Sequence, residues 1–237
     1  MIGARPVRDH GRSSCAEMKT RTAYRVLMFA NATYLRQRYG EEFYRSFRMA
    51  ADDKLRELIP RIPDLSGSVA SMSYAFITAY VPFVHAFKQF DETRNRAGEL
   101  LWVRNENLLQ RFPSAIRSLL GRMATSKTML KSLRAAQLQG EQGLLHPMDW
   151  RVVIEEAAEG GHRTTWTQCG ALQALRAIGE DGVFPYACRI DYLMANLMGL
   201  QFVRTKTLAD GDDCCNNYIA GPGFTEWAPE KGFEHRR

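Results

Sequence analysis

The sequence predicts an α+β protein, in which a helical N-terminal half packs on a small C-terminal β-sheet with two helices. Two observations predict this fold class. Apolar side chains recur at helical spacing over residues 18–140, whereas the chain after Gly140 alternates short β-branched runs with glycine turns. The 237 residues, 45% of them apolar, are enough to bury a core without disulfide bonds.

Composition divides the chain into four regions. Residues 1–17 are polar and show no periodicity, so we expect a disordered tail. Residues 18–140 are the helical region, 141–220 the α+β region, and 221–237 a tail rich in Gly and Pro that extends over the surface. We expect residues 18–220 to form one domain.

The helical region consists of amphipathic segments separated by prolines and glycines. In segment 22–39, Tyr24, Leu27 and Met28 begin an apolar stripe close to the i, i+3, i+4, i+7 spacing of a helix. Segment 41–58 opens with two acids, which suit the positive end of a helix. The other predicted helices are one that starts near Ser66 or Ser68, one over 97–112 and a helical stretch over 113–139.

The most apolar stretch is residues 68–87, SVASMSYAFITAYVPFVHAF. It holds three Ser, one Thr, one His and the internal Pro82. Polar groups and an internal proline are atypical of a membrane span. We therefore expect a buried helix or a pair of helices, and no membrane partner.

The C-terminal region alternates strand and helix signals. β-branched residues on both sides of an EGGH turn predict a β-hairpin over residues 150–168. Two apolar stretches that follow each end at a glycine, as helices commonly do. The elements predicted after the hairpin are helices over 170–179 and 185–199, a strand over 200–208, a DGDD turn and a returning strand over 214–220.

The net charge of +6 is unevenly distributed. Residues 1–148 hold 23 Lys and Arg against 13 Asp and Glu, a net +10, and residues 149–237 hold 9 against 13, a net −4. The basic residues stand singly among acids, and no zinc-finger, RRM or KH signature occurs. We therefore expect a small-molecule partner and no nucleic acid, and homo-oligomerisation stays open.

The cysteines point to a reducing compartment. The N-terminus lacks the apolar stretch of a secretory signal, so we expect a cytoplasmic protein whose five cysteines are mostly reduced. Cys169, Cys188 and the pair Cys214–Cys215 are too far apart for the close C-x₂-C pairs of structural zinc sites. We expect no metal and no cofactor. A Cys/His/Asp catalytic set stays open, with His162 or His146 as the base.

A longer pattern runs through the C-terminal region. Cys188 and Asp191 form C-x₂-D, Met198 and Gly199 follow, and residues 202–212 read F-x-R-T-x-T-L-A-x-G-D before Cys215. These motifs resemble the C-terminal signature of the L-2-amino-thiazoline-4-carboxylic acid hydrolase family. The resemblance covers residues 165–217, and the helical N-terminal half is similar to that family's layout only in general character.

The resemblance implies ring opening of a cyclic isothiourea or amidine that bears a carboxylate. It implies Cys215 as the nucleophile, with Cys188 in reserve, and Asp191 as the group that binds or protonates the amidine nitrogens. Arg204 would hold the substrate carboxylate. The remaining candidates for substrate binding are Thr205, Thr207, Asn216, Asp212 and His162.

The chain departs from the family pattern directly after Cys215. Members of the family typically continue with Asp and Phe, where this sequence has Asn216 and Asn217. An Asn keeps an acceptor but loses the charge of a general base. The departure leaves room for a non-hydrolytic biosynthetic enzyme, such as a cyclase or isomerase, and for a small-molecule-binding sensor. An interaction protein built on the helical half is a third alternative.

Each cysteine assigned to the site also has a purely structural explanation. Cysteine is often a core residue. Cys214 and Cys215 face opposite sides of a strand, so one of them belongs to the core, and the resemblance favours Cys215 for the site.

The charged candidates also have structural explanations. Asp191 lies where it could complement a helix dipole. Arg204 could pair with Asp212 or Asp213 across a hairpin. His162, beside the EGG turn, could be a solvated turn residue.

Overall fold

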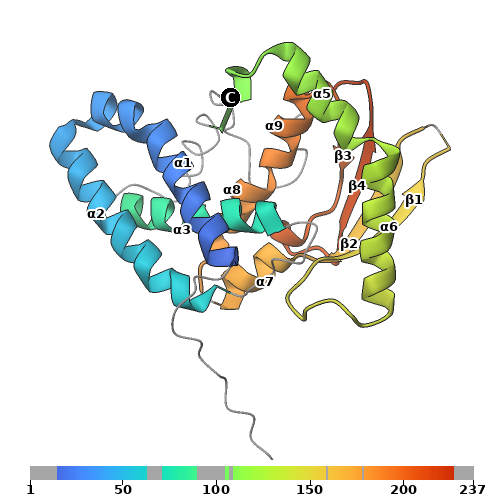
Figure 1. Cartoon of the computed structure of the whole chain (residues 1–237), viewed down its shortest axis with the longest axis horizontal. Coiled ribbons are helices and arrows are strands. Elements are labelled where there is room, and N and C mark those ends of the chain that lie inside the picture. The colour runs from blue at the N-terminus through green and yellow to red at the C-terminus, as the bar shows by residue number, and fades with distance from the viewer. Residues whose placement is uncertain are drawn as a thin grey trace, which may run out of the picture.

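The fold is known from a computed structural model, which describes residues 15–62, 71–89, 105–106, 109–158, 160–177 and 179–226. It confirms the predicted α+β class, with helices in the N-terminal part and one four-stranded antiparallel sheet near the C-terminus (Figure 1). The predicted N-terminal and C-terminal tails lie mostly outside the described residues.

The N-terminal helices pack around an aromatic core. They are α1 (Cys15–Tyr39), α2 (Glu41–Leu58) followed by the 3-10 turn η1 (Ile59–Arg61), and α3 (Ser71–Lys88). Phe47 is fully buried and contacts Phe83 and Phe87 edge to face, with ring centroids 5.0 and 4.8 Å away. α1 begins at Cys15, so its first turn includes residues that we predicted to lie in the tail.

Helix α3 is a single helix that continues through Pro82. It supplies buried side chains to two cores, Phe83 and Tyr80 to the N-terminal cluster and Tyr74 and Val81 to the cluster around Trp150. Its burial explains the apolar sequence. None of the helices in the described part of the chain is long and apolar enough to cross a membrane.

The rest of the helical region is less regular than predicted. The stretch 113–139 is two helices, α5 (Ser114–Ala124) and α6 (Lys127–Glu141). They separate because the Ser126 side chain accepts a hydrogen bond from the Met129 N–H and so caps α6. The helix predicted over 97–112 falls mostly outside the described residues.

The sheet has the strand order β1-β2-β4-β3, and every neighbouring pair is antiparallel. The predicted hairpin is confirmed as β1 (Arg151–Glu156) and β2 (His162–Gln168). Its turn uses Gly161 at φ +77°, where an added Cβ would lie 2.3 Å from the Ile219 carbonyl oxygen. The other pair is β3 (Gln201–Arg204) and β4 (Cys215–Ala220). β3 is shorter than the strand predicted over 200–208.

The helix predicted over 185–199 is wrong as a single element. After α7 (Gly170–Ala177) and the 3-10 turn η2 (Asp181–Val183), the chain forms α8 (Phe184–Cys188) and α9 (Ile190–Leu197). The break falls at Arg189, whose fully buried guanidinium pairs with Asp210 in the 3-10 turn η3 (Leu208–Asp210). This ion pair fixes the direction of the chain between α8 and α9.

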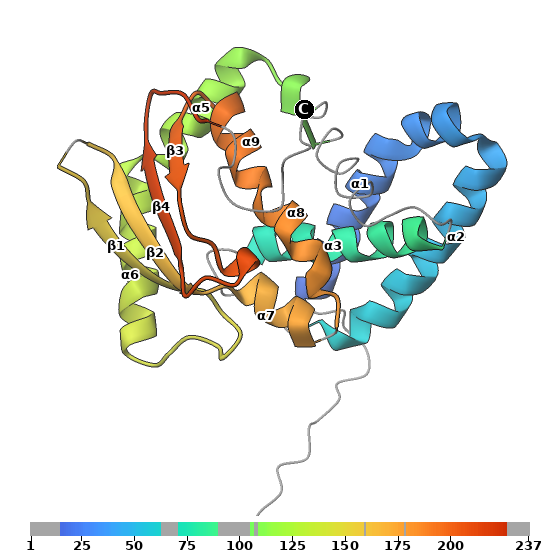
Figure 2. The same ribbon diagram turned by 180° about the vertical axis from the view of Figure 1, so that it is seen from behind.

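The two views agree on where the sheet sits (Figures 1 and 2). Helix α9 runs between the N-terminal helices and the sheet, and α6 lies across the β1 side. α9 contacts β3 and α6 contacts β1. The face of the sheet toward these helices, here called the inner face, is where the buried strand residues gather.

Candidate active site

The strand register places the chemically important side chains in rows on the inner face. Residues paired directly across antiparallel strands share a face. Thr164 pairs with Asn217, and Asn217 pairs with Arg204, which gives a polar row. The row on one side holds Trp166 and Cys215, and the row on the other holds His162, Ile219 and Phe202.

A cavity of about 380 Å³ covers these rows. Most of its wall is apolar, with Met194, Met198 and Leu200 on the side of α9. Its ionisable and polar side chains, apart from thiols, are His162, Thr164, Asp191, Arg204 and Asn217, and its thiols are Cys169, Cys188 and Cys215. An apolar pocket with a few convergent polar groups is the usual form of a small-molecule site.

The Thr207 hydroxyl contacts two of these thiols. Its side chain is fully buried, and its Oγ1 lies 3.5 Å from Cys188 Sγ and 3.5 Å from Cys215 Sγ. The Leu208 backbone N–H donates to Cys215 Sγ at 3.2 Å. Cys215 therefore sits at the end of the cavity under a loop that supplies it with hydrogen-bond donors.

Charged side chains hold that loop in place. The Asp212 carboxylate accepts the Thr207 backbone N–H at 2.7 Å, and the Arg189–Asp210 ion pair ties η3 to the junction of α8 and α9. Arg189 is fully buried, so this ion pair reaches from the protein interior to η3. The loop is thus positioned by ionic contacts outside the cavity.

Arg204 is the cation among the described residues that line the cavity. Its Nη1 donates to Asp191 Oδ2 at 3.2 Å and to Cys188 Sγ at 3.4 Å, and its guanidinium faces the Tyr192 and Phe202 rings at 5.0 and 5.5 Å. The side chain of Arg204 is 1% exposed and that of Asp191 58%. The predicted anchor and its acidic neighbour therefore form one ion pair at the rim of the cavity.

The predicted structural pairing of Arg204 is wrong. Asp213 pairs with Lys206 at 3.0 Å, and Asp212 caps the Thr207 N–H. Neither carboxylate reaches Arg204, because both lie in the exposed turn after η3.

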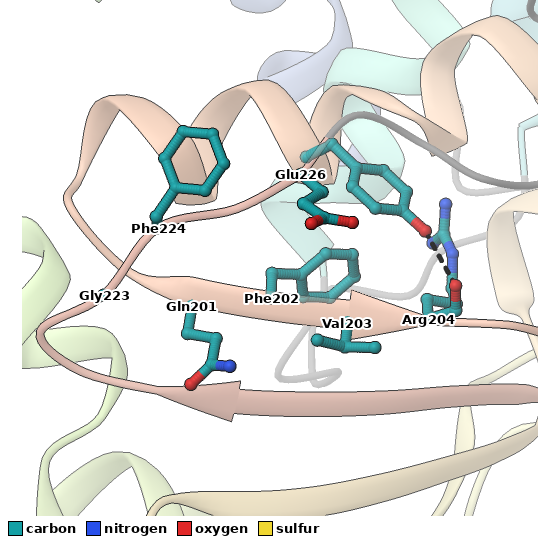
Figure 3. A pocket seen from close by; sticks show the side chains of 8 residues that line it. Gln201, Phe202, Val203, Arg204, Gly223, Phe224 and Glu226 are labelled. Carbon is teal, nitrogen blue, oxygen red and sulfur yellow. Dashed lines mark hydrogen bonds between the residues drawn. The ribbon is translucent and has the colours of Figure 1, made fainter.

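A second hollow, about 520 Å³, also has Arg204 in its lining (Figure 3). Residues of β3, among them Phe202 and Arg204, line it together with Tyr192, Gly223, Phe224 and Glu226. It shares Phe202 and Arg204 with the inner cavity but has no thiol in its lining. We therefore place the covalent chemistry in the inner cavity.

Burial sets the protonation of three cavity groups. It raises the pKa of the Cys169 thiol to about 12 and that of Cys188 to about 11, although the nearby Arg204 opposes the shift at Cys188. Both thiols are therefore protonated at neutral pH and are poor nucleophiles. Burial also lowers the pKa of His162 from its ordinary value, which favours the neutral imidazole.

The structure gathers some predicted site residues and separates others. Cys188, Asp191, Arg204, Cys215 and His162 line the cavity, and Thr207 contacts two of its thiols. His162 is buried, so the solvated-turn explanation is wrong.

Thr205, Asn216 and Asp212 do not line the cavity. Asn216 faces outward and accepts the backbone N–H groups of Thr205 and Lys206 at 3.0 and 2.7 Å. It therefore holds the loop from behind, and any contact with substrate stays a prediction.

Sequence reasoning missed part of the cavity wall. Thr164, Trp166, Cys169 and Asn217 all line it, and none was predicted as a site residue. Alternation along β4 was the available signal, because Cys215 inward implies Asn216 outward and Asn217 inward.

All five cysteines are free in the structure. Within the described ranges, no group of three or more His, Cys, Asp and Glu side chains is arranged to hold a metal ion.

A family model described as L-2-amino-thiazoline-4-carboxylic acid hydrolase matches residues 75–218. The match runs from α3 to β4 and so includes Cys188, Arg204 and Cys215. Neither the curated proteins nor the solved structures give a match.

Proposed function

The chain belongs to the L-2-amino-thiazoline-4-carboxylic acid hydrolase family, and on that premise we propose that it hydrolyses a small cyclic amidine or isothiourea that bears a carboxylate. In this proposal Cys215 attacks the amidine carbon and Arg204 holds the carboxylate. The observation that carries the assignment is the position of Cys215. Its thiol lines the cavity and contacts both the Leu208 N–H and the Thr207 hydroxyl.

Elimination among the cavity thiols supports the same choice. Burial holds Cys169 and Cys188 in the protonated form, as their raised pKa values require. Cys188 also lies between Arg204 and Thr207, which suits a supporting contact. This leaves Cys215 as the thiol at which the family chemistry is best placed.

The covalent step balances without an external base. The basic amidine nitrogen of the substrate takes the Cys215 proton, and the sulfur electron pair forms a bond to the amidine carbon. One ring bond from that carbon to a heteroatom then breaks, and the heteroatom leaves with the proton. Water attacks the same carbon, the bond to sulfur breaks, and the Cys215 thiol is restored.

The ion pair at the rim orients the substrate in this proposal. The Arg204 guanidinium offers planar N–H donors that match a carboxylate, and Asp191 can accept N–H groups from the neutral amidine end. The two charges lie 3.2 Å apart, so a ring with a carboxylate at one end and amidine N–H groups at the other can bridge them. Arg204 is then a binding residue, and Cys215 the catalytic one.

Turnover and trapping test the proposal. We expect 2-amino-thiazoline-4-carboxylate to yield a carbamoyl-cysteine with the wild-type protein, at least about 100-fold more slowly with Cys215→Ala, and at a similar rate with the control Cys214→Ser. Intact-mass analysis of a quenched reaction should show an adduct on the wild type that Cys215→Ala lacks. Full activity of Cys215→Ala would contradict the nucleophile assignment.

A non-hydrolytic conversion is the second candidate. The mostly apolar cavity wall favours it, because few groups there could activate water. Reaction in ¹⁸O-labelled water separates the two. A hydrolase incorporates one labelled oxygen into its product, whereas a cyclase or isomerase incorporates none.

A further inference from the structure

We propose that the protein binds an anionic lipid surface through the outward side of α5 and α6. This side, here called the α5–α6 face, combines an apolar stripe with exposed lysines, and its main residues are Ile116, Leu119, Leu120, Met123, Lys127 and Lys131. The inference is independent of the proposed function, because none of these residues lines the inner cavity. The expectation of no membrane partner concerned a spanning segment, and a contact at the membrane surface does not need one.

Helix α5 turns its apolar side to the solvent. Its inward side is marked by Gly121, where an added Cβ would lie 2.6 Å from the Met198 carbonyl oxygen. Leu119 and Met123 are each two positions from Gly121, about half a turn around the helix, and so lie on the opposite side. The large apolar side chains of α5 are 39% to 56% exposed, and they are Ile116, Leu119, Leu120 and Met123. Their spacing forms one stripe, which a surface helix ordinarily turns toward the core.

Helix α6 turns a row of basic side chains outward. Lys127, Lys131 and Arg134 have the spacing i, i+4, i+7, which places them on one side of the helix. Leu133, which is buried, marks the inward side. Arg134 pairs with Glu156, whereas Lys127 and Lys131 are exposed and form no ion pair in the described part of the chain. Because α5 leads directly into α6 along one edge of the molecule (Figures 1 and 2), the stripe and the lysines are neighbours.

The charge around the stripe is of one sign. From residue 107 to residue 140 the sequence holds no Asp or Glu, and its basic residues are Arg111, Arg117, Arg122, Lys127, Lys131 and Arg134. A second copy of the chain would bring the same charges against these, which disfavours a dimer through this face. An anionic lipid surface attracts them instead, and long basic side chains can keep their charge at the headgroups while the apolar stripe enters the bilayer.

The shape of the face favours a lipid surface over an acidic protein. The strongest contacts between proteins are large side chains that fill pockets. The stripe lies on the convex side of a helix, and its residues line neither the inner cavity nor the second hollow. A bilayer accepts a convex apolar stripe without a matching pocket, so the combination of stripe and lysines is typical of a helix that lies in the membrane interface.

Flotation of the full-length protein with lipid vesicles tests the inference. Three vesicle types are compared, namely phosphatidylcholine alone and phosphatidylcholine with about 30% of either phosphatidylserine or phosphatidylglycerol. We expect binding to both anionic mixtures to be at least about tenfold stronger than to phosphatidylcholine alone at about 0.1 M salt. The difference should vanish at about 1 M salt, where charges are screened within about 3 Å. Equal binding to all three vesicle types, or binding to none, would overturn the inference.

Paired charge variants assign the binding to this face. Lys127→Gln combined with Lys131→Gln should weaken binding to the anionic vesicles by at least about tenfold, because each cation near such a surface contributes about fivefold. Arg25→Gln combined with Arg176→Gln removes the same charge from exposed positions on α1 and α7, and should weaken binding by less than about twofold. Equal losses in the two double variants would show that net charge, and not this face, governs the binding.

Paired apolar variants test the stripe. Met123→Ser should weaken binding to the anionic vesicles by at least about fivefold, because less apolar surface enters the bilayer. Met49→Ser, on α2 at a position that is 63% exposed, is the control and should leave binding unchanged. Unchanged urea midpoints would show that all variants are folded. A dimer in sedimentation velocity that Met123→Ser dissociates, without vesicle binding by the wild type, would assign the face to a second copy and overturn the inference.

Discussion

At the scale of single residues, Thr207 is the contact point between the two buried thiols and the loop above them. Its hydroxyl lies 3.5 Å from each of Cys188 Sγ and Cys215 Sγ and accepts the Ala209 N–H at 3.2 Å. A β-branched residue without a hydroxyl keeps the shape but removes all three contacts. Thr207 thus decides whether the loop over Cys215 keeps its conformation.

We predict that Thr207→Val lowers the free energy of unfolding by about 1–3 kcal/mol, because the half-buried Ala209 N–H loses its acceptor. Thr207→Ser should restore most of that loss. Thr205→Val, at an exposed position two residues earlier, is the matched control and should cost less than about 1 kcal/mol. Urea unfolding gives all three values, and equal effects at 205 and 207 would contradict the role of Thr207.

His162 makes stability depend on pH. Burial lowers its pKa in the folded protein from the ordinary value of 6.5. Between the folded pKa and 6.5 the unfolded chain therefore binds more protons than the folded one. The free energy of unfolding then rises with pH through this window and falls on acidification.

We predict that His162→Gln flattens this part of the pH profile. Urea midpoints measured from pH 8 to pH 5 provide the test. A wild-type profile as flat as that of His162→Gln would show that burial of His162 does not govern the dependence.

Strand alternation explains which residues of the site could be predicted from the sequence. It placed Cys214 and Cys215 on opposite faces. The expectation that the cysteine outside the site, Cys214, belongs to the core is wrong, because Cys214 is only half-buried and Cys215, which lines the cavity, is the buried one. The same alternation carried two residues further places Asn216 on the outer face and Asn217 in the cavity. Motif matching instead favoured Asn216, because it follows Cys215 directly. The register across strands, which brings Thr164 and Trp166 beside them, depends on distant pairing and is not visible in a local pattern.

At the scale of elements, close contact between α5 and α9 supports one wall of the cavity. A Cβ added at Gly121 of α5 would lie 2.6 Å from the Met198 carbonyl oxygen, a backbone atom that cannot rotate away. Met198 and Leu200, which contact this point, both line the cavity. Gly121 is therefore needed for packing, although glycine is a poor helix former.

We predict that Gly121→Ala lowers the free energy of unfolding by about 1–3 kcal/mol and weakens ligand binding, because α9 must shift. Gly140→Ala in α6 is the control. There the added Cβ meets only the Leu145 side chain, at 3.2 Å, and the better helix propensity should make the change neutral or stabilising by up to about 1 kcal/mol. A stabilised Gly121→Ala would contradict the packing argument.

Element prediction failed where a tertiary contact overrides a local pattern. The sequence of 185–199 has helical spacing throughout, yet the buried Arg189 turns the chain between α8 and α9 to reach Asp210. Likewise β3 ends at Arg204, after which Asn216 and Asp212 bind the loop backbone. All three partners lie more than four residues away along the sequence, so periodicity could not reveal them.

At the scale of the whole molecule, α3 connects the two parts of the fold. The composition change at Gly140 predicted a helical part and a mixed part. It did not predict that one helix would serve both cores, because that depends on which neighbours cover its opposite faces. Phe83 belongs to the N-terminal cluster and Val81 to the cluster around Trp150, only two residues away. A helix that supplies buried side chains to two cores should make them unfold together.

We therefore predict that a cavity in the N-terminal core destabilises the distant sheet equally. Phe47→Ala removes a fully buried ring from among Phe83 and Phe87 and should cost about 3–5 kcal/mol. In a background with Trp102→Phe and Trp227→Phe, the remaining tryptophans, Trp150 and Trp166, report on the C-terminal region, while circular dichroism reports on all helices. Both urea curves should shift by the same amount, as one cooperative unit requires.

Phe29→Ala, at a position that is 86% exposed, is the control and should shift neither curve. A fluorescence curve that stays in place while the dichroism curve moves would show that α3 does not couple the two cores.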